Sequence, residues 1–356
     1  MRAQNGEQTR RSPVDKRTPT DPMTTLKAVA QQLVAPGKGI LAADESFPTI
    51  EKRFKPLGIT STDDNRRAYR ETLFTAPELG RSISGVILFD ETLRQKSQGG
   101  IPLAGVLESQ GIIPGIKVDK GAVDLANFAG EKITEGLDGL RDRLTEYRTL
   151  GARFTKWRAV IGIAGSSPSR TCIEANVLEL ARFAALSQEA GLVPIVEPEV
   201  LMDGDHTIAR CEEVTDVILP ALFSRLDEHR VKLDGLLLKC AMILPGTKNA
   251  AKVDDDEIAR RTLACLKRNV MSGVAGIVFL SGGQSPEEAT RRLAAINRAG
   301  PAPWPLTFSF GRALQDPALK AWKGLPENVA KAQAALVEVA QANSRAVMGK
   351  TPGTSA

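Results

Sequence analysis

The sequence predicts an α/β protein that folds as a (β/α)8 TIM barrel, in a single domain with a long C-terminal helix. Two observations predict this fold. Short runs of apolar, often β-branched residues recur along the chain, and segments of helical length lie between them, commonly beginning at Ser, Thr or Asp and ending near Gly. Eight such runs occur in a chain of 356 residues, and that number fits a closed barrel better than an open sheet.

The expected elements follow one another in order. The eight expected strands are Gly39–Ala43, Gly85–Phe89, Ile112–Val118, Phe154–Ile163, Leu192–Val196, Leu233–Lys239, Gly276–Leu280 and Leu306–Phe310. The clearest expected helices are Asp63–Leu73, Thr171–Ala190, Asp254–Val270, Pro286–Ala299 and the long amphipathic C-terminal helix Pro326–Met348. No linker or change in composition interrupts the region between them, so residues 23–349 are expected to form one domain.

The two ends of the chain differ from this domain. Residues 1–22 show no hydrophobic periodicity, so we expect a disordered N-terminal extension, with Met23 as an alternative start. A transit peptide is the competing interpretation, and the acidic Glu7, Asp15 and Asp21 disfavour it. Residues 350–356, rich in small residues with a Gly and a Pro, are expected to form a flexible tail.

Composition excludes several classes of protein. The net charge of +5 is scattered, and only 4% of residues are aromatic, which disfavours a nucleic-acid-binding surface. No apolar run approaches the roughly 20 residues needed to cross a bilayer. Four cysteines without a Cys-x-x-Cys pair indicate reduced thiols and a cytoplasmic protein. With two histidines, a zinc site is disfavoured, although Asp203, Asp205 and His206 could bind an ion in a loop; we expect no metal and no cofactor.

Lys239 lies in GLLLKCAMILPG, a run that is otherwise apolar. One interpretation is a strand whose lysine reaches solvent or forms a buried ion pair. The other is an amine held neutral so that it attacks a carbonyl carbon. The residues at the other strand ends favour the second interpretation.

Polar and charged residues gather at the expected carboxyl ends of the strands. Strand side chains alternate between two faces, so residues two apart, such as Lys117 and Asp119, point the same way, which in a barrel is the mouth. A single charged pair is commonly structural, but charges at so many strand ends are costly to bury without a function. The residues concerned are Asp44, Glu45, Ser46, Lys117, Asp119, Lys156, Arg158, Glu197, Glu199, Lys239, Ser281, Gly282, Gly283, Ser309, Gly311 and Arg312.

As a set, these motifs resemble the class I fructose-1,6-bisphosphate aldolases. The resemblance runs from about Thr24 to Gly349 and is carried by ILAADES, VILFDETL, GIKVDKG, KWR, VPIVEPE, LLLK, FLSGGQS, FSFGRAL and ALKAW. It implies a (β/α)8 lyase of glycolysis and gluconeogenesis, commonly a homotetramer. Such an enzyme reversibly cleaves fructose 1,6-bisphosphate to dihydroxyacetone phosphate and glyceraldehyde 3-phosphate through a lysine Schiff base, without a metal.

The same resemblance implies catalytic roles. Lys239 corresponds to the Schiff-base amine, and Lys156 to the lysine whose like charge helps to keep that amine neutral. Glu197 corresponds to the general acid and base, oriented by Glu199, and the acidic neighbour is expected to raise the pKa of Glu197. Asp44 corresponds to the carboxylate beside the C4 hydroxyl of the substrate.

Two phosphate sites are also implied. The C1-phosphate site would use glycines that let backbone N–H groups approach and an arginine that adds charge. Its residues would be Ser281, Gly282, Gly283, Ser309, Gly311 and Arg312. The C6-phosphate side would comprise Ser46, Thr49, Arg53, Lys117, Asp119 and Arg158. Phe47 and Pro48 replace smaller residues that are usual in the family, and this leaves the geometry of that loop open.

Two alternatives remain open from the sequence. A transaldolase-like or deoxyribose-phosphate-aldolase-like enzyme would share the lysine but would not need cations on both sides of the mouth. A binding or scaffold protein could keep the fold without turnover, but Asp44, Glu197 and Lys239 are all present. Tyr69 and Tyr147, the only tyrosines, lie in expected helices, so the tail 350–356 lacks the terminal tyrosine of many animal aldolases, and we expect its removal to have little effect.

Overall fold

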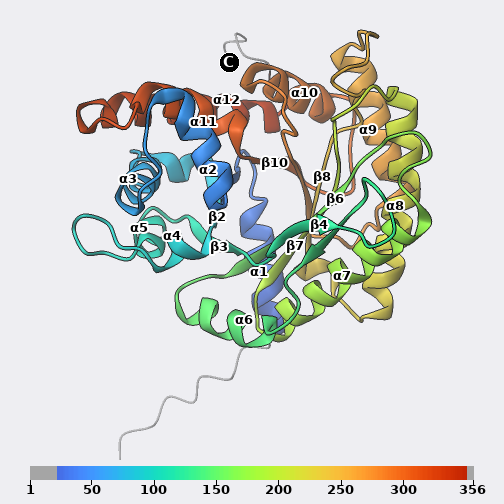
Figure 1. The fold of residues 1–356 in the computed structure, drawn as a ribbon, viewed down its shortest axis with the longest axis horizontal. Coiled ribbons are helices and arrows are strands. Elements are labelled where there is room, and N and C mark those ends of the chain that lie inside the picture. The colour runs from blue at the N-terminus through green and yellow to red at the C-terminus, as the bar shows by residue number, and fades with distance from the viewer. Residues whose placement is uncertain (1–21, 351–356) are drawn as a thin grey trace, which may run out of the picture.

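A closed barrel of parallel strands forms the centre of the molecule, and helices surround it (Figure 1). The structure is a computed structural model that describes residues 22–350. Around the barrel the strands follow the order β1-β2-β3-β6-β7-β8-β9-β10, and β10 pairs with β1. They are β1 Gly39–Ala43, β2 Ile83–Leu88, β3 Ile113–Lys117, β6 Phe154–Ile161, β7 Val193–Val200, β8 Leu237–Cys240, β9 Gly276–Phe279 and β10 Leu306–Phe310. The expected fold class and all eight expected strands are confirmed.

The helices begin where the sequence provides caps. The side chains of Thr62, Ser169, Asp254 and Ser285 each accept a hydrogen bond from a backbone N–H in the first turn of the following helix, and Ser285 completes a capping box with Glu288. The helices are α1 Pro22–Leu33, α2 Phe47–Phe54, α3 Asp63–Phe74, α4 Asp90–Arg94, α5 Leu103–Ser109, α6 Leu140–Thr149, α7 Arg170–Glu189, α8 Ile208–Glu228, α9 Asp255–Asn269, α10 Pro286–Arg298, α11 Arg312–Trp322 and α12 Val329–Val347.

Helix α1 closes one end of the barrel, and it was not expected from the sequence. Leu26, Ala30 and Leu33 form one apolar cluster with residues inside the barrel such as Phe154 and Leu237. The helix lies at the amino ends of the strands, since it packs against the short turn that precedes β8. The boundary expected at residue 22/23 therefore lies at the start of a helix; residues 1–21 and 351–356, including most of the expected extension and tail, lie outside the described residues.

A two-stranded antiparallel hairpin, also unexpected from the sequence, lies between β3 and α6. Its strands are β4 Gly121–Asp124 and β5 Lys132–Glu135. Three of the four residues of β4 are exposed, so the strand lacks the buried apolar pattern from which strands are predicted. The hairpin begins immediately after the β3 end and therefore borders the barrel mouth.

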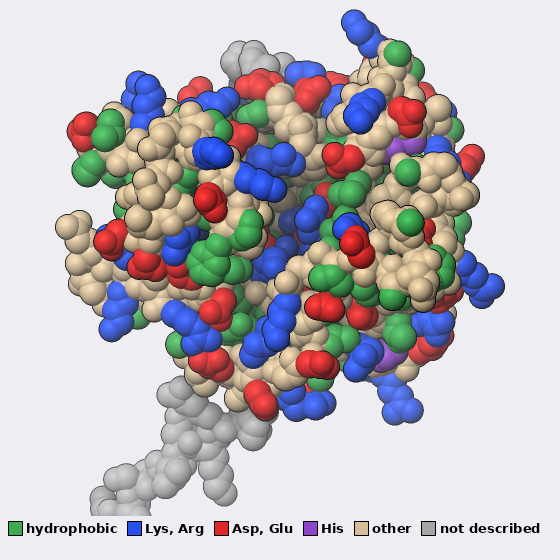
Figure 2. All heavy atoms as spheres, viewed as in Figure 1, with side chains coloured by type: hydrophobic (Ala, Val, Ile, Leu, Met, Phe, Trp, Pro, Cys, Tyr) green, Lys and Arg blue, Asp and Glu red, His purple; other side chains and the backbone are tan. Residues whose placement is uncertain are grey.

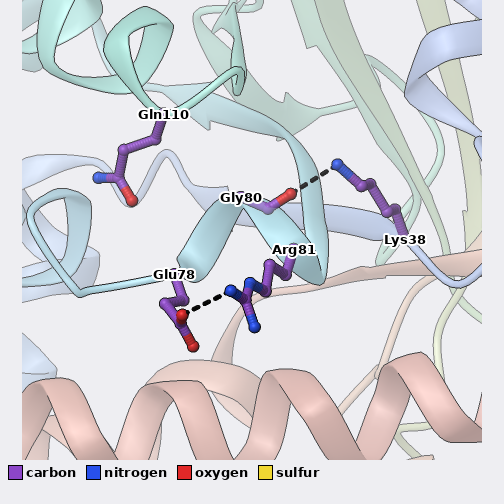
Figure 3. A pocket seen from close by; sticks show the side chains of 5 residues that line it. All are labelled: Lys38, Glu78, Gly80, Arg81 and Gln110. Atoms are coloured by element: carbon purple, nitrogen blue, oxygen red, sulfur yellow. Dashed lines mark hydrogen bonds and ion pairs between the residues drawn. The ribbon is translucent and has the colours of Figure 1, made fainter.

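Because all strands of the barrel are parallel, their carboxyl ends meet at one end. At the opposite end, a polar hollow of about 550 Å³ lies beside residues that precede β1, β2 and β3. There Lys38 Nζ donates a hydrogen bond to the carbonyl oxygen of Gly80 at 2.6 Å, and Arg81 pairs with Glu78 at 2.8 Å (Figure 3). Its polar groups are thus largely paired with one another. Among residues 22–350, no helix is long and apolar enough to cross a bilayer.

Candidate active site

One cavity of about 980 Å³ opens at the carboxyl ends of the strands. Figure 2 shows a hollow near the middle of the molecule in which Lys and Arg side chains gather. All of the site residues expected from the sequence line this cavity except Gly283. Their convergence from seven strand ends follows from the parallel barrel, which brings those ends together.

A chain of alternating charges occupies the floor of the cavity. Lys239 Nζ lies 3.1 Å from Glu197 Oε1, and Lys156 Nζ lies 3.4 Å from Glu197 Oε2 and 2.7 Å from Asp44 Oδ2. Lys239, Lys156 and Glu197 are buried, each with at most 4% of its surface exposed. Lys239 therefore does not reach solvent; it lies in a buried ion pair inside a cavity, which combines features of both interpretations of the sequence.

These contacts hold the carboxyl groups ionised. Burial would raise the pKa of Asp44, but the attraction of Lys156 and Lys239 outweighs it and lowers that pKa to about 2. Burial likewise acts to raise the pKa of Glu197, and Lys239, Lys156 and Arg158 outweigh it, so that the pKa lies below its usual range. The pKa of Lys156 is raised, because Asp44 and Glu197 overcome the opposing effect of burial.

The expectation that Glu199 raises the pKa of Glu197 is wrong. The register of β6 and β7 places Arg158 opposite Glu197 and Val160 opposite Glu199. The carboxylate of Glu199 turns to Arg158 and forms an ion pair with its Nε, while Glu197 faces the two lysines. The charged group paired with Lys239 is the Glu197 carboxylate, and not the like-charged amine of Lys156 that the resemblance implied.

The expected C6-phosphate residues line one side of the cavity. Ser46 Oγ and Thr49 Oγ1 lie 3.1 Å apart at the start of α2. Lys117 Nζ pairs with Asp119 Oδ1 at 2.7 Å, and Asp119 also accepts a hydrogen bond from the backbone N–H of Arg158 at 3.3 Å. Asp119 thus acts as a buried anchor for the two cations that flank it.

The loop that the sequence left open adopts a regular helix start. Ser46 is the N-cap of α2, and Pro48 occupies one of its first positions, where a missing N–H costs nothing. The Phe47 ring packs edge-on against Phe89 at 5.2 Å, and the Arg66 guanidinium lies over it at 4.7 Å. Phe47 therefore forms part of an aromatic wall beside the mouth.

Arg53 lines the cavity, but its guanidinium is already occupied. It forms ion pairs with Glu45 and with Asp316 Oδ1, the latter at 2.9 Å, and donates to Gln315 Oε1 at 3.1 Å. Only 10% of its side chain is exposed. The expectation that Arg53 binds phosphate is therefore not supported by its contacts, since two carboxylates already compensate its charge.

The expected C1-phosphate residues gather on the other side. Gly282 has φ of +58°, which favours glycine, and a Cβ atom there would lie 3.0 Å from the side chains of Leu280 and Met202, so both the backbone and the space disfavour a side chain. Ser309 Oγ is buried without a hydrogen-bond partner among the described residues. Arg312 is exposed and opens α11, so helix N–H groups and a cation face the same space. Gly283 lies beside Arg312, since a Cβ atom on Gly283 would lie 3.5 Å from Arg312 Nη2.

Several residues of the cavity were missed from the sequence. Lys52 and Lys120 are exposed cations at its rim; Lys120 belongs to the quoted motif GIKVDKG and could have been included. Arg94 and Tyr147 come from α4 and α6. No local pattern marks them, because only the packing of those helices brings them to the mouth.

The alternative ion site in the loop after β7 finds no support. In the part of the chain that the structure describes, no group of three or more His, Cys, Asp or Glu side chains could hold a metal ion. His206 is buried and neither ring nitrogen has a hydrogen-bond partner there. Burial lowers the pKa of His206 and outweighs the effect of Asp205.

Fold and site together define a class of protein: a (β/α)8 barrel enzyme with a buried lysine amine among carboxylates and anion-binding groups on either side of it. Comparison with known proteins gives the particular family. Residues 25–356 match the sequence model of the family described as fructose-bisphosphate aldolase class-I. The chain belongs to this family, whose members are lyases that act on a phosphorylated sugar through a Schiff base.

Individual relatives cover nearly the whole chain. A probable fructose-bisphosphate aldolase class 1 of Xanthomonas campestris is 56% identical over 92% of this chain and 98% of its own length. Fructose-bisphosphate aldolase C of Carassius auratus is 49% identical over 93% of this chain and 92% of its own length. Among solved structures, the aldolase of Plasmodium falciparum, in complex with TRAP and an inhibitor, has a TM-score of 0.93 at 48% identity and covers 95% of this chain and 98% of its own.

Proposed function

We propose that this cavity reversibly cleaves fructose 1,6-bisphosphate to dihydroxyacetone phosphate and glyceraldehyde 3-phosphate, with Lys239 as the Schiff-base amine. The observation that carries the proposal is the buried pair of Lys239 Nζ and Glu197 Oε1 at 3.1 Å. At this distance the amine and the carboxyl group could exchange a proton, and the proposed anion-binding residues line the same cavity on either side of them. Cationic or N–H donors on both sides suit a substrate with a phosphate at each end.

Schiff-base formation begins when the Lys239 lone pair attacks the C2 carbonyl carbon. Transfer of one proton from Lys239 to Glu197 within their ion pair would supply a neutral amine and a carboxylic acid together. The carbonyl oxygen gains a proton from the amine and becomes the carbinolamine hydroxyl. Glu197 then adds a second proton, water leaves, and a protonated iminium remains.

Carbon–carbon cleavage follows from the iminium. Asp44 takes the proton of the C4 hydroxyl, the electron pair of the C3–C4 bond moves toward the iminium, and glyceraldehyde 3-phosphate leaves. The enamine that remains gains at C3 a proton equivalent to the one that Asp44 took up, which returns Asp44 to its charged form, and addition of one water to the iminium releases dihydroxyacetone phosphate and restores Lys239. The low pKa of Asp44, about 2, means that this group is ionised at neutral pH, as a proton acceptor must be.

The phosphates would occupy the two sides of the mouth. The N-terminus of α11 with Arg312, Ser281 and Gly282 would bind the C1 phosphate. Ser46, Thr49, Lys117 and Arg158 would bind the C6 phosphate. Glu199 and Asp119 would hold Arg158 and Lys117 in place through the ion pairs described above.

The decisive experiment is borohydride reduction in the presence of dihydroxyacetone phosphate, followed by mapping of the modified peptide. We expect the label on Lys239, and we expect activity to survive a chelator, because the iminium serves as the electrophile. Lys239→Arg is the matched control and should take no label. Label on Lys117 or Lys156, or loss of activity in chelator, contradicts the proposal.

The assembly and location of the chain are also proposals. Family resemblance supports a homotetramer, and relatives from Arabidopsis thaliana 52–53% identical to this chain bear names that call them cytosolic. We propose a cytoplasmic homotetramer. Sedimentation equilibrium should give a mass about four times that of the chain, and a monomeric mass at micromolar concentration would contradict it.

A further inference from the structure

A buried polar cluster adjoins the candidate catalytic carboxylate Asp44. Its centre is Glu45, the next residue in the chain, whose carboxylate accepts hydrogen bonds from Arg70 Nη2 at 2.6 Å and from Gln315 Nε2 at 2.9 Å. Arg53 completes the set with an ion pair to the same carboxylate. Only 11% of the Glu45 side chain and 4% of the Arg70 side chain are exposed, so water contributes little to these contacts.

Gln315 connects the members of this cluster. Its side chain is fully buried, and both ends of its amide are used. Nε2 donates to the carbonyl oxygen of Ala42 at 2.6 Å as well as to Glu45, and Oε1 accepts from Tyr69 Oη and Arg53 Nη1, each at 3.1 Å. No hydrogen-bonding capacity of this amide remains for a substrate, and the residue is out of its reach.

These contacts join α11, which carries Gln315, to the end of β1. Gln315 lies three residues after Arg312, and its backbone N–H bonds to the carbonyl oxygen of Gly311 at 3.0 Å, so it belongs to the first turn of α11. Ala42 and Glu45, its partners, flank the end of β1 from which Asp44 projects. One side chain thus ties the helix start that would bind the C1 phosphate to the strand end that carries the candidate proton acceptor.

Stability alone does not account for such a cluster. Burying two arginines, a glutamate and a glutamine costs desolvation energy, and apolar residues of similar volume are often as stable. A fully paired polar network does fix one relative arrangement of the elements that it joins, because each bond has a narrow range of distance and direction. Elements that must hold a ligand at set distances benefit from such a constraint.

We propose that Gln315 is a positioning residue for the C1-phosphate site: it fixes the first turn of α11, and with it Arg312, relative to β1 and Asp44. The proposal rests on the proposed function. Gln315 does not touch the substrate and takes no part in proton transfer. Loss of Gln315 would leave the catalytic groups in the cavity but would allow the phosphate site to move relative to them. The affinity for substrate should therefore fall more than the rate of the chemical step.

The test compares Gln315→Met with Gln188→Met. Gln188 is a matched control, because its amide also ties a helix to loop backbone, with Nε2 donating to Lys232 O at 2.8 Å and to Gly235 O at 3.2 Å, but at the amino end of β8. The apparent dissociation constant of dihydroxyacetone phosphate is read from the concentration dependence of borohydride trapping, and KM and kcat are measured for the bisphosphate. For Gln315→Met we expect the dissociation constant and KM to rise about tenfold while the saturating trapping rate and kcat stay within about threefold.

The control variant should lose thermal stability without a change in either constant. Should Gln315→Met fail to fold, Gln315→Glu has the same shape, loses the two bonds from Nε2, and should show the same rise in both constants. Binding within twofold of the unmodified chain in whichever variant folds, or an equal effect of Gln188→Met, overturns the positioning role. Failure of the unmodified chain to be trapped at Lys239 would instead refute the proposed function itself.

Discussion

At the scale of single residues, the chemistry depends on which charge lies next to which. Lys239, Glu197, Lys156 and Asp44 alternate in sign over contacts of 2.7–3.4 Å. An arrangement of this kind can move a proton between neighbours without taking up or releasing one, which suits a reaction with several proton transfers. In the proposed mechanism Lys239 acts in Schiff-base formation, Glu197 in the loss of water and Asp44 in carbon–carbon cleavage.

Replacement of Glu197 by Gln keeps the shape of the side chain and removes its ability to accept and donate a proton. We expect turnover to fall by about 10²–10⁴, since general acid–base catalysis commonly contributes that much, while the substrate still binds. Steady-state kinetics with the bisphosphate and direct binding of an unreactive analogue measure the two effects separately. Near-normal turnover would shift the acid and base role to Asp44 or Glu199.

Arg312 and Lys117 should separate the two phosphate sites. Arg312→Ala is expected to raise KM for both the bisphosphate and fructose 1-phosphate, because both carry the C1 phosphate. Lys117→Ala is expected to raise KM mainly for the bisphosphate. An equal loss with both substrates in both variants would mean that the two sites are wrongly assigned.

At the scale of elements, the barrel depends on a helix that closes its amino end. Leu33 of α1 is fully buried and packs with Phe154 and Ile40 inside the barrel. The Phe154 ring lies so near β2 and β3 that a Cβ atom on Gly115 would approach it to 2.3 Å. Packing this dense leaves little room for the barrel to collapse around a deletion.

Leu33→Ala should therefore destabilise the protein by about 2–5 kcal/mol, the usual range for a Leu removed from a dense core. Leu325→Ala, at a site where 44% of the residue is exposed, should cost less than about 0.5 kcal/mol. Denaturant unfolding followed by circular dichroism compares the two. A small effect of Leu33→Ala would show that α1 contributes little to closing the barrel.

At the scale of the whole molecule, the buried carboxylates of the mouth link stability to pH. The folded-state pKa of Asp44, about 2, and those of Glu45 and Glu197 lie below their ordinary values, despite burial, because neighbouring cations attract the charged forms. Their contribution is present above the unfolded pKa values and is lost as pH falls through the folded ones. The window is therefore from about pH 4.5 down to about pH 2.

Melting temperatures should accordingly fall between about pH 4.5 and about pH 2. The whole contribution of Asp44 ionisation to the free energy of unfolding is about 2 kcal/mol, since one pKa unit corresponds to about 1.4 kcal/mol. The melting temperature of the Asp44→Asn variant should fall less steeply with decreasing pH over that range than the melting temperature of the unmodified chain. Equal slopes in the two proteins would assign the acid sensitivity to other groups.

Much of the architecture is present in local sequence patterns. The eight buried runs predict strands within a few residues of their actual ends, and caps such as Ser285 predict helix starts, because both signals arise from neighbouring residues. The motifs at the strand ends identify the residues of the mouth for the same reason. Helix α1 and the β4–β5 hairpin escaped prediction, since α1 is specified by contacts inside the barrel and the hairpin strand β4 is mostly exposed.

By itself, then, the sequence determined the barrel, the end of it where the site lies, and the identity of the charged groups on the floor of the cavity. Only the tertiary structure decided how those groups pair. The register of β6 against β7 places Arg158 opposite Glu197, yet the Arg158 side chain pairs with Glu199, and Glu197 pairs with Lys239. Contacts between α2, α11 and the end of β1 pair Arg53 with Glu45 and join buried Gln315 to Arg53 and to the carbonyl oxygen of Ala42. Such pairings join residues far apart in the chain, and the pKa and reactivity of a charged group depend on which partner it meets.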